Sequence, residues 1–427
     1  MSPDPRTLPD PFEIRPLDRA PDTDVVLPGS KSITIRALVC AALAEGRSTL
    51  RGALFADDTE AMLSVLDGLG IATEIDVDSA TIAVDGCGGE LPGVDAEVSA
   101  NQSGTTARFA VPLAALGEAP VVVDAHPQMR DRPMDDQFAA LRAMGVTIEE
   151  LGDPGRLPAR ITGPLQRHDA ALAGDVSSQF ITGLLLAGGA DHARVALTTE
   201  PISRPYIQMT TAVMEAFGAE VDHDGERVWA VGGGYQGTDY AVEPDASAAS
   251  YFLAAAAITG GRVRVLGLGR DALQGDVAFA EVLDQMGCSV TFGDDFVEVS
   301  GRAHRGVDVD LSDISDTAPT LAVVAAFADS PTRVDGIGFI REKESDRVAG
   351  PVTELRRAGV DAEEFDDGFI IRPDGRPGPA TFATYDDHRM AMALSLVGLV
   401  VPGVAVRDPG CVAKTFPGFF SALEQLR

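Results

Sequence analysis

Lysine is rare in this chain, and the places where it occurs are the first sign of chemistry. Three lysines stand among 34 basic residues, each in a short polar motif: Lys31 in 28–32 (PGSKS), Lys343 in 341–347 (REKESDR) and Lys414 in 413–417 (AKTFP). Lysine is a compact charge with a tunable pKa, whereas arginine presents a planar and permanently charged fork. Chance placement on solvated faces is the alternative, but all three motifs lie beside candidate anion-binding elements.

Polar side chains also crowd the starts of six apolar helices, predicted near Ser32, Thr105, Ser178, Ser247, Thr317 and Asp387. For any one helix, capping of free N–H groups explains them. As a set they indicate an anion site, because helix N-termini carry partial positive charge and attract phosphate and carboxylate groups. The residues are Lys31, Ser32, Arg36, Asn101, Gln102, Ser103, Gly104, Thr105, Arg108, Ser177, Ser178, Gln179, Asp313, Asp316, Asp386, Asp387, His388 and Arg389.

Two carboxylates are candidates for moving protons. Glu344 stands between Lys343 and Arg347 just before a predicted helix, where neighbouring cations can tune an acid or a base. Asp316 is the second candidate. A solvated face is the alternative reading of the charged run around Glu344.

The predicted helix that begins near Asp387 carries two further candidates. Arg389 lies in its first turn, where a cation opposes the helix dipole, so its presence indicates an anionic partner. For His388, a structural and a functional role are equally open from the sequence.

Composition sets the broad class. The chain has 427 residues, 45% of them hydrophobic, and a formal net charge of −31, which fits a globular protein of two or three domains and argues against a nucleic-acid or anionic-membrane partner. Its four cysteines are far apart and form no metal-binding pairs, so we expect reduced thiols in a cytoplasmic protein. No apolar signal segment opens the chain, and the longest apolar stretch, 390–406, is too short to span a bilayer.

The same pattern of elements recurs about every 70 residues. A small-residue apolar helix is followed by a β-branched run, an amphipathic helix and a polar hairpin, such as 288–292 with 296–300. Ordinary α/β alternation is the alternative. The amphipathic helices are predicted to end at glycines suited to a left-handed C-cap, namely Gly70, Gly145, Gly218, Gly287 and Gly359.

The last repeat stops before any hairpin, whereas the N-terminal segment holds unassigned β-prone pieces at 12–14 and 24–26. We therefore predict that the N-terminal piece completes the sheet of the last repeat. Two domains follow, one from residues 26–243 with three repeats, the other from residues 1–25 plus 244–427 with three more. The site is expected in the cleft between them.

Nine motifs, in this order, resemble the 5-enolpyruvylshikimate-3-phosphate synthase family of enolpyruvyl transferases over nearly the whole chain. They are 27–32 (LPGSKS) with Arg36, 103–108 (SGTTAR), Arg132-Pro133, 177–179 (SSQ), 203–206 (SRPY), Asp316, 343–347 (KESDR), 387–390 (DHRM) and 414–417 (KTFP). The resemblance implies an α/β fold, a two-domain inverse α/β barrel with six βαβαββ-type repeats, three per domain. It also implies transfer of the enolpyruvyl group of phosphoenolpyruvate to the 5-hydroxyl of shikimate 3-phosphate, without metal or organic cofactor, by a monomer.

Site roles follow from the same resemblance, residue by residue. Shikimate 3-phosphate is expected to contact Lys31, Ser32, Arg36, Ser177, Ser178, Gln179, Ser203, Asp316 and Lys343. Phosphoenolpyruvate is expected to contact Lys31, Gly104, Gln128, Gln179, Arg347, Arg389 and Lys414. The catalytic residues would be Asp316, which takes the hydroxyl proton, and Glu344 with Lys31, which handle the proton added to the methylene carbon.

Three positions depart from the usual pattern of the family. Gln128 stands where an arginine often contacts phosphoenolpyruvate, with Arg130 a candidate to compensate; Phe339 and Ile35 replace polar residues. Two other readings stay open: a UDP-N-acetylglucosamine enolpyruvyl transferase, which usually has asparagine after the first lysine, and a non-catalytic anion-binding relative. Ser32 and the 177–179 motif disfavour the first, and intact Asp316, Glu344 and Lys31 disfavour the second.

Overall fold

The computed structural model describes residues 4–427, which fall into two units, each formed around its own core. The continuous unit comprises Gly29–Glu243, and the discontinuous unit comprises the residues up to Pro28 together with Pro244–Arg427. Both crossings of the chain therefore involve short segments next to a proline. Residues 1–3, which the sequence analysis assigns to the second domain, lie outside the described residues.

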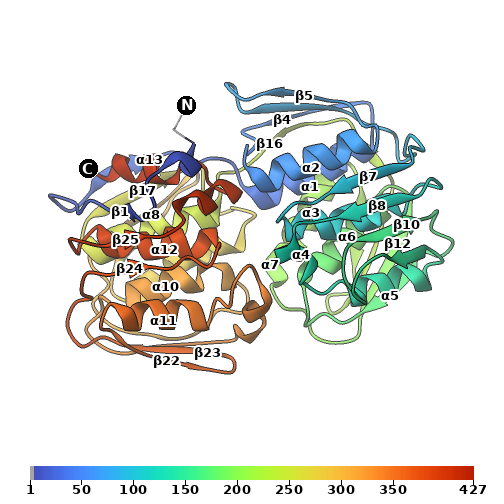
Figure 1. The fold of residues 1–427 in the computed structure, drawn as a ribbon. Coiled ribbons are helices and arrows are strands. Elements are labelled where there is room, and N and C mark those ends of the chain that lie inside the picture. Colours follow the sequence, from blue (N-terminus) through green and yellow to red (C-terminus); the bar gives the residue numbers. More distant parts are fainter. Residues whose placement is uncertain (1–3) are drawn as a thin grey trace. The chain divides into compact units, whose positions relative to one another are not determined.

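The continuous unit alternates helices and strands from end to end (Figure 1). Its elements are α1 (Lys31–Leu43), β3 (Ala44–Glu45), β4 (Arg47–Arg51), α2 (Asp57–Gly68), β5 (Thr73–Asp76), β6 (Thr81–Asp85), β7 (Ala96–Ser99), α3 (Gly104–Ala114), β8 (Val121–Asp124), α4 (Pro127–Arg130), α5 (Asp135–Ala143), β9 (Thr147–Glu150), β10 (Ala159–Thr162), β11 (Asp169–Leu172), α6 (Ser178–Gly189), β12 (His192–Leu197), α7 (Arg204–Ala216), β13 (Glu220–His223), β14 (Val228–Gly232), β15 (Tyr235–Gln236) and β16 (Asp239–Ala241).

The discontinuous unit repeats the alternation, with several 3-10 turns (η). Its elements are η1 (Pro5–Thr7), β1 (Phe12–Glu13), β2 (Asp22–Val25), α8 (Ala246–Thr259), β17 (Arg262–Leu266), η2 (Gly275–Ala278), α9 (Phe279–Gln285), β18 (Ser289–Phe292), β19 (Phe296–Ser300), β20 (Asp308–Asp310), η3 (Ser315–Thr317), α10 (Ala318–Ala325), β21 (Thr332–Asp335), η4 (Gly338–Glu342), α11 (Ala349–Arg357), β22 (Asp361–Phe365), β23 (Gly368–Arg372), β24 (Thr381–Phe382), α12 (His388–Gly398), β25 (Ala405–Val406), η5 (Pro409–Lys414), α13 (Phe419–Leu423) and η6 (Glu424–Leu426).

One sheet pattern recurs in both units. In β7-β8-β10-β9, the first two strands are parallel and flank helix α3, and the remaining contacts are antiparallel. The sheets β11-β12-β14-β13 and β20-β21-β23-β22 have the same order and directions. In each of these sheets, one apolar helix therefore connects the two parallel strands, and an antiparallel hairpin completes the sheet.

At the crossings, the parallel partner comes from a distant part of the chain. Strand β16 pairs in parallel with β4, and β2 pairs in parallel with β17. The predicted use of residues 12–14 is confirmed, because β1 pairs with β25 of the last sheet. The β-prone piece at 24–26 belongs instead to β2, in the sheet of β17.

The apolar helices form the two cores. In the continuous unit, α1, α3 and α6 pack against one another; in the discontinuous unit, α8, α10 and α12 do so. Close packing explains their small residues: a Cβ on Gly183 of α6 would lie 2.3 Å from the Arg108 carbonyl oxygen of α3. A helix that is apolar on all sides must be buried, and residues 246–258 of α8 are buried without interruption.

The more polar helices lie toward the outside of each core. In Figure 1, α11 stands between α10 and the β22–β23 hairpin. The predicted C-terminal glycines are confirmed just after these helices, where Gly70, Gly145, Gly218, Gly287 and Gly359 all have positive φ. Within residues 4–427, we find no helix long and apolar enough to cross a membrane, and the four cysteines are free thiols.

Candidate active site

Lys31 lies where three helices of the continuous unit begin. Ser30 caps α1, since its Oγ accepts a hydrogen bond from the Ile33 backbone N–H. The Nζ of Lys31 lies 3.5 Å from Oδ2 of Asp58 in the first turn of α2. Thr106, in the first turn of α3, donates its hydroxyl to the Asp58 carbonyl at 3.0 Å. The lysine is thereby placed beside the N-termini of α2 and α3, whose partial positive charges add to its own.

Arg36 is a buried cation that donates hydrogen bonds to neutral groups. Its guanidinium donates to Oγ1 of Thr210 at 2.8 Å, to the Ser32 carbonyl at 2.8 Å and to the Tyr206 carbonyl at 3.3 Å. Burial lowers the pKa of Arg36 to about 10, which leaves it protonated at neutral pH. Its charge thus remains available to attract an anion near Ser32.

Gln179 bridges α3 and α6. Its side-chain amide donates to Oγ1 of Thr105 at 3.3 Å, and its carbonyl oxygen accepts from Arg108 at 2.6 Å. The hydroxyl of Ser177 caps α6 by accepting from the backbone N–H of Gln179 at 3.3 Å. The predicted residues Ser177, Ser178 and Gln179 are therefore fixed at one helix start, with Ser178 the first helical residue.

The N-terminus of α3 lies directly beneath a guanidinium group. A Cβ added to Gly104 would lie 2.4 Å from Nη1 of the buried Arg132, so a larger residue there would require the guanidinium to shift. Arg130, expected to compensate for Gln128, instead binds Asp124 through two hydrogen bonds of 2.8 and 2.6 Å and is exposed. Arg132, two residues later, is the arginine held at this helix start, and compensation by Arg130 stays a prediction.

Ser203 precedes α7 in an unusual conformation. Its φ of 51° and ψ of 45° place it in the left-handed region, which costs a residue with a Cβ about 1–3 kcal/mol and is concentrated at functional sites. No side-chain hydrogen bond from Ser203 caps the helix. Its carbonyl accepts from the Tyr206 backbone N–H at 3.0 Å, which connects it to the Arg36 contacts described above.

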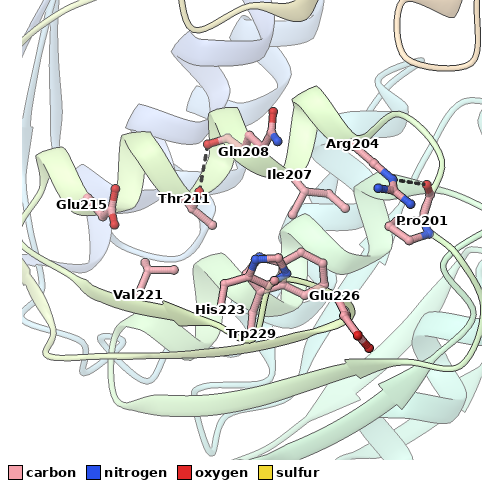
Figure 2. Close-up of a pocket in the computed structure, with 11 residues that line it drawn as sticks. Pro201, Arg204, Ile207, Gln208, Thr211, Glu215, Val221, His223, Glu226 and Trp229 are labelled. Atoms are coloured by element: carbon pink, nitrogen blue, oxygen red, sulfur yellow. Dashed lines mark hydrogen bonds between the residues drawn. The ribbon is translucent and has the colours of Figure 1, made fainter.

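The other side of α7 borders a cavity of about 280 Å³ (Figure 2). Ile207 and Gln208 lie on its helix side, and the stacked rings of His223 and Trp229 lie opposite, with centroids 4.2 Å apart. None of the site residues predicted from the sequence lines this cavity.

Arg347 is the centre of an ionic network in the discontinuous unit. It is 2% exposed and donates to Asp387 at 2.8 and 3.0 Å, to Asp316 at 3.1 Å and to Glu344 at 2.7 Å. Burial by itself lowers the pKa of Arg347, but the three carboxylates outweigh burial and raise it above its usual value. The arginine is therefore permanently charged, and it holds both candidate proton carriers, Asp316 and Glu344, in place.

Arg389 extends this network to the start of α8. Its Nη2 donates to Oδ2 of Asp316 at 2.7 Å and lies 3.4 Å from Oγ of Ser247. Asp387 caps α12 by accepting from the Arg389 backbone N–H at 2.9 Å. The hydroxyl of Ser247 donates to the buried carboxylate of Asp276. Burial, followed by repulsion from Asp316, raises the pKa of Asp276 to about 6.

Lys414 and His388 complete the cluster. Nζ of Lys414 lies 3.8 Å from Oε1 of Glu344, and only 3% of its side chain is exposed. Burial, reinforced by nearby Arg389, holds the pKa of His388 well below its usual range. His388 is thus a neutral, buried imidazole at pH 7 rather than a cation that attracts an anion.

Lys343 lies near an aromatic ring. Its Nζ lies 5.9 Å from the ring centroid of Phe339, which gives the lysine an aromatic face where the family usually has a polar residue. Ile35, the third unusual position, is fully buried in the core of the continuous unit.

The structure gathers the predicted residues into two groups. The first group lies near the helix starts of the continuous unit and consists of Lys31, Ser32, Arg36, Gly104, Gln179 and Ser203. The second group is the ionic network of the discontinuous unit and consists of Asp316, Glu344, Arg347, Arg389 and Lys414. Gln128 lies in the short helix α4. Sequence reasoning missed Asp276, which lies in a 3-10 turn without periodicity, and it gave Arg132 no site role although Arg132-Pro133 was one of the recognised motifs.

Comparisons with known proteins agree over nearly the full length of the chain. Residues 20–423 match the family described as EPSP synthase (3-phosphoshikimate 1-carboxyvinyltransferase). The chain is 44% identical over 423 residues to 3-phosphoshikimate 1-carboxyvinyltransferase of Nostoc punctiforme, covering 98% of this chain and 99% of that protein. It is 43% identical over 408 residues to the protein of that name from Serratia proteamaculans, covering 94% and 95%.

Solved structures give the same picture of the fold. EPSP synthase from Acinetobacter baumannii aligns with a TM-score of 0.82 and 27% identity, covering 98% of each chain. The enolpyruvyl transferase NikO from Streptomyces tendae aligns with a TM-score of 0.73 at 20% identity, covering 97% of this chain and 96% of that chain, a likeness of fold alone. The fold is that of the enolpyruvyl transferases, an α/β class. Within this class the chain belongs to the EPSP synthase family, which confirms the resemblance of its motifs.

Proposed function

We propose that the protein transfers the enolpyruvyl group of phosphoenolpyruvate to the 5-hydroxyl of shikimate 3-phosphate and releases phosphate, a step in aromatic amino acid biosynthesis. Family membership across residues 20–423 supports the reaction. The observation that carries the chemistry is the network of Arg347, which joins three cations, counting Arg389 and Lys414, to the two carboxylates Asp316 and Glu344.

Charge favours a separate binding task for each group of residues. Arg36 and the serines at the starts of α6 and α7 suit the phosphate of shikimate 3-phosphate, because their recorded partners are neutral and leave positive charge uncompensated. Lys343 supports that ligand. Arg347, Arg389 and Lys414 suit the carboxylate and phosphate of phosphoenolpyruvate. Gly104, Gln128 and Gln179 assist there, together with Arg132, whose guanidinium lies over the start of α3.

Proton transfer completes an addition and an elimination. During addition, the substrate oxygen bonds to C2 of phosphoenolpyruvate, the hydroxyl proton passes to Asp316, and C3 receives a proton from Glu344 or Lys31. During elimination, the C2–O bond to phosphate breaks, C3 returns its proton, and the proton on Asp316 leaves with the phosphate. The double bond re-forms in the product, so atoms and charges balance without a metal or an organic cofactor.

Holding two anions together is the main energetic task. Phosphoenolpyruvate and shikimate 3-phosphate repel each other, and correct positioning of two reactants is worth roughly 7–11 kcal/mol of barrier. We propose that the residues of both units act on the same pair of substrates. We also propose that the enzyme works as a monomer in the cytoplasm, without nucleic acid; size-exclusion chromatography with light scattering tests the oligomeric state.

A direct assay tests the reaction. Purified protein is incubated with phosphoenolpyruvate and either shikimate 3-phosphate or UDP-N-acetylglucosamine, and released phosphate is measured. We expect release with shikimate 3-phosphate alone. Turnover with the sugar nucleotide would identify the related transferase instead, and tight binding of both anions without phosphate release would identify a non-catalytic relative.

A further inference from the structure

Two histidines and an aspartate meet at one edge of the continuous unit, apart from the residues discussed above. His168 immediately precedes β11, His192 opens β12, and Asp191 lies in the turn between α6 and β12. Each side chain offers one ligand atom, and the three atoms lie within 4.8 Å of one another. Among residues 4–427 this is the one group of its kind that reaches such proximity.

The backbone that carries these side chains is regular. Strands β11 and β12 pair in parallel, and the Arg194 backbone N–H donates to the His168 carbonyl at 2.6 Å. The imidazole rings of His168 and His192 stack with centroids 3.7 Å apart and an interplanar angle of 25°. The two rings therefore lie face to face before any ligand arrives, and the pairing of β11 with β12 fixes the spacing of the backbone next to them.

Hydrogen bonds orient both rings. Nδ1 of His192 lies 2.9 Å from Oδ1 of Asp191, and Nδ1 of His168 lies 3.0 Å from the His192 carbonyl and 3.7 Å from Oδ2 of Asp191. A carboxylate or carbonyl on one ring nitrogen fixes the tautomer and leaves the other nitrogen with a lone pair, which is how metal-binding histidines are usually supported. Ligation of one ion requires the exposed side chains of His192 and Asp191 to rotate, because two stacked rings direct their nitrogen lone pairs along nearly parallel lines.

Space and charge permit a bound ion. A cavity of about 510 Å³ borders both histidines and leaves room for water ligands. Two arginines also line it, but each is directed elsewhere: Arg167 donates to the Ala143 carbonyl at 3.2 Å, and Arg194 lies 3.9 Å from Asp169. The carboxylate of Asp191 adds an oxygen ligand next to the two imidazoles.

We propose that His168, His192 and Asp191 form a binding site for one divalent transition-metal ion of the Zn²⁺, Ni²⁺ or Co²⁺ type. Two imidazole nitrogens and one carboxylate oxygen are the ligands that such ions prefer, whereas Mg²⁺ and Ca²⁺ favour oxygen ligands alone. Binding forms two metal–nitrogen bonds and one metal–oxygen bond. Any proton on a ligating nitrogen is released to solvent, and no electron is transferred.

The site has a structural consequence for the fold. Its ion would join the end of α6, next to Asp191, to the start of β11 at His168, and so tie down the turn between α6 and β12. Ser178 and Gln179 lie at the opposite end of α6, about 18 Å away for a helix of this length. The ion therefore takes no part in the proposed reaction, and the inference holds whether or not that reaction is correct.

Titration of tag-free, chelator-treated protein with Co²⁺ tests the proposal, because Co²⁺ absorption reports its ligands. We expect one ion per chain at pH 7.5 and displacement by Zn²⁺ but not by Mg²⁺. The melting temperature should rise with metal concentration, since only the folded chain holds the site.

Variants decide whether these residues are the ligands. H168A and H192A should each weaken Co²⁺ binding about tenfold or more, and D191N should also weaken it. The matched control is H223A: His223 lies 3.8 Å from Asp224 and stacks on Trp229 rather than on a second imidazole. Wild-type affinity in both H168A and H192A, or an equal loss in H223A, would overturn the proposal. These side chains are partly or largely exposed, so unchanged circular dichroism is expected in every variant.

Discussion

Two buried arginines, one in each unit, have opposite kinds of hydrogen-bond partner. Arg36 and Arg347 are both 2% exposed. Arg36 donates to hydroxyl and carbonyl oxygens, and burial lowers its pKa to about 10. Arg347 donates to three carboxylates, which raise its pKa in spite of burial. The two arginines are equally buried, so the charge of their hydrogen-bond partners decides whether the pKa is lowered or raised.

The difference teaches how an acidic protein binds anions. Neutral partners leave the charge of Arg36 free to attract a phosphate, at the cost of a destabilised cation. Acidic partners stabilise Arg347 and place two carboxylates where protons must move, at the cost of competition with an incoming anion. In our proposal the first arrangement suits binding of shikimate 3-phosphate, and the second suits proton transfer next to phosphoenolpyruvate.

Substitution of Arg347 tests this comparison most directly and should have the largest effect. R347M leaves Asp387, Asp316 and Glu344 without their shared cation, and removal of one partner from a buried ionic network costs about 3–5 kcal/mol of unfolding free energy. R36M removes a costly cation and leaves neutral groups, so its loss should be about 1 kcal/mol. Urea denaturation followed by circular dichroism measures both, and equal losses would contradict the distinction.

A second test removes the proposed proton acceptor, Asp316. D316N keeps the size of the side chain but not its basicity, so kcat should fall about 10²- to 10⁴-fold while both KM values change little. D308N, which alters an exposed carboxylate of β20, is the control and should leave kcat unchanged. Steady-state phosphate release gives these constants. Wild-type turnover in D316N would remove Asp316 from the mechanism.

A third test uses the pH dependence of stability, to which the buried Asp276 contributes. Because its folded pKa is raised from 3.8 to about 6, the folded state binds more protons than the unfolded state between these values, and stability falls as pH rises through this window. D276N abolishes that charge, so it should be about 1–3 kcal/mol more stable than wild type at pH 7.5 and show no such gain at pH 4. Urea denaturation at both pH values checks this, and a gain independent of pH would contradict it.

Substrate affinities should separate the two groups of residues. K414A, which removes a cation beside Glu344, should raise KM for phosphoenolpyruvate about tenfold and leave KM for shikimate 3-phosphate nearly unchanged. S203A should show the reverse preference with a smaller effect, since it removes one hydroxyl. Equal effects of each variant on both substrates would count against the assignment.

The smallest effect is expected at Gly104. G104A places a methyl group 2.4 Å from Nη1 of Arg132, so the guanidinium must shift, and KM for phosphoenolpyruvate should rise a few-fold, about 0.5–1 kcal/mol. Gly117, in the same unit, is the matched control, because a Cβ there meets only Leu91 at ordinary contact distances of 3.4 Å and above. If G117A and G104A have the same KM values, Arg132 does not act through this helix start.

Local chemistry explains what sequence alone could predict. The apolar helices begin within about one residue of their predicted starts, because serine or aspartate caps such as Ser177 and Asp387 mark those starts directly. The C-terminal glycines were equally visible, since only glycine readily adopts their positive φ.

Long-range pairing explains what it could not predict. Nothing local to β2 indicates that its partner is β17, more than two hundred residues later, or that β16 joins β4. That Arg130 binds Asp124 while Arg132 lies at the start of α3 is likewise a result of tertiary folding, and the order of the residues does not indicate it. Asp276 reaches Ser247 only through tertiary folding, and no spacing in the chain connects them.

The parallel pairing of β2 with β17 has a consequence for synthesis on the ribosome. When β2 emerges, its partner has not been translated, and the whole of Gly29–Glu243 must appear first. The strand must therefore remain unpaired while the intervening unit assembles and closes its own sheet with β16. The acidic side chains of Asp22 and Asp24 are well placed to keep this waiting segment hydrated and out of wrong sheets until Arg262, to which both bind in the finished protein, arrives.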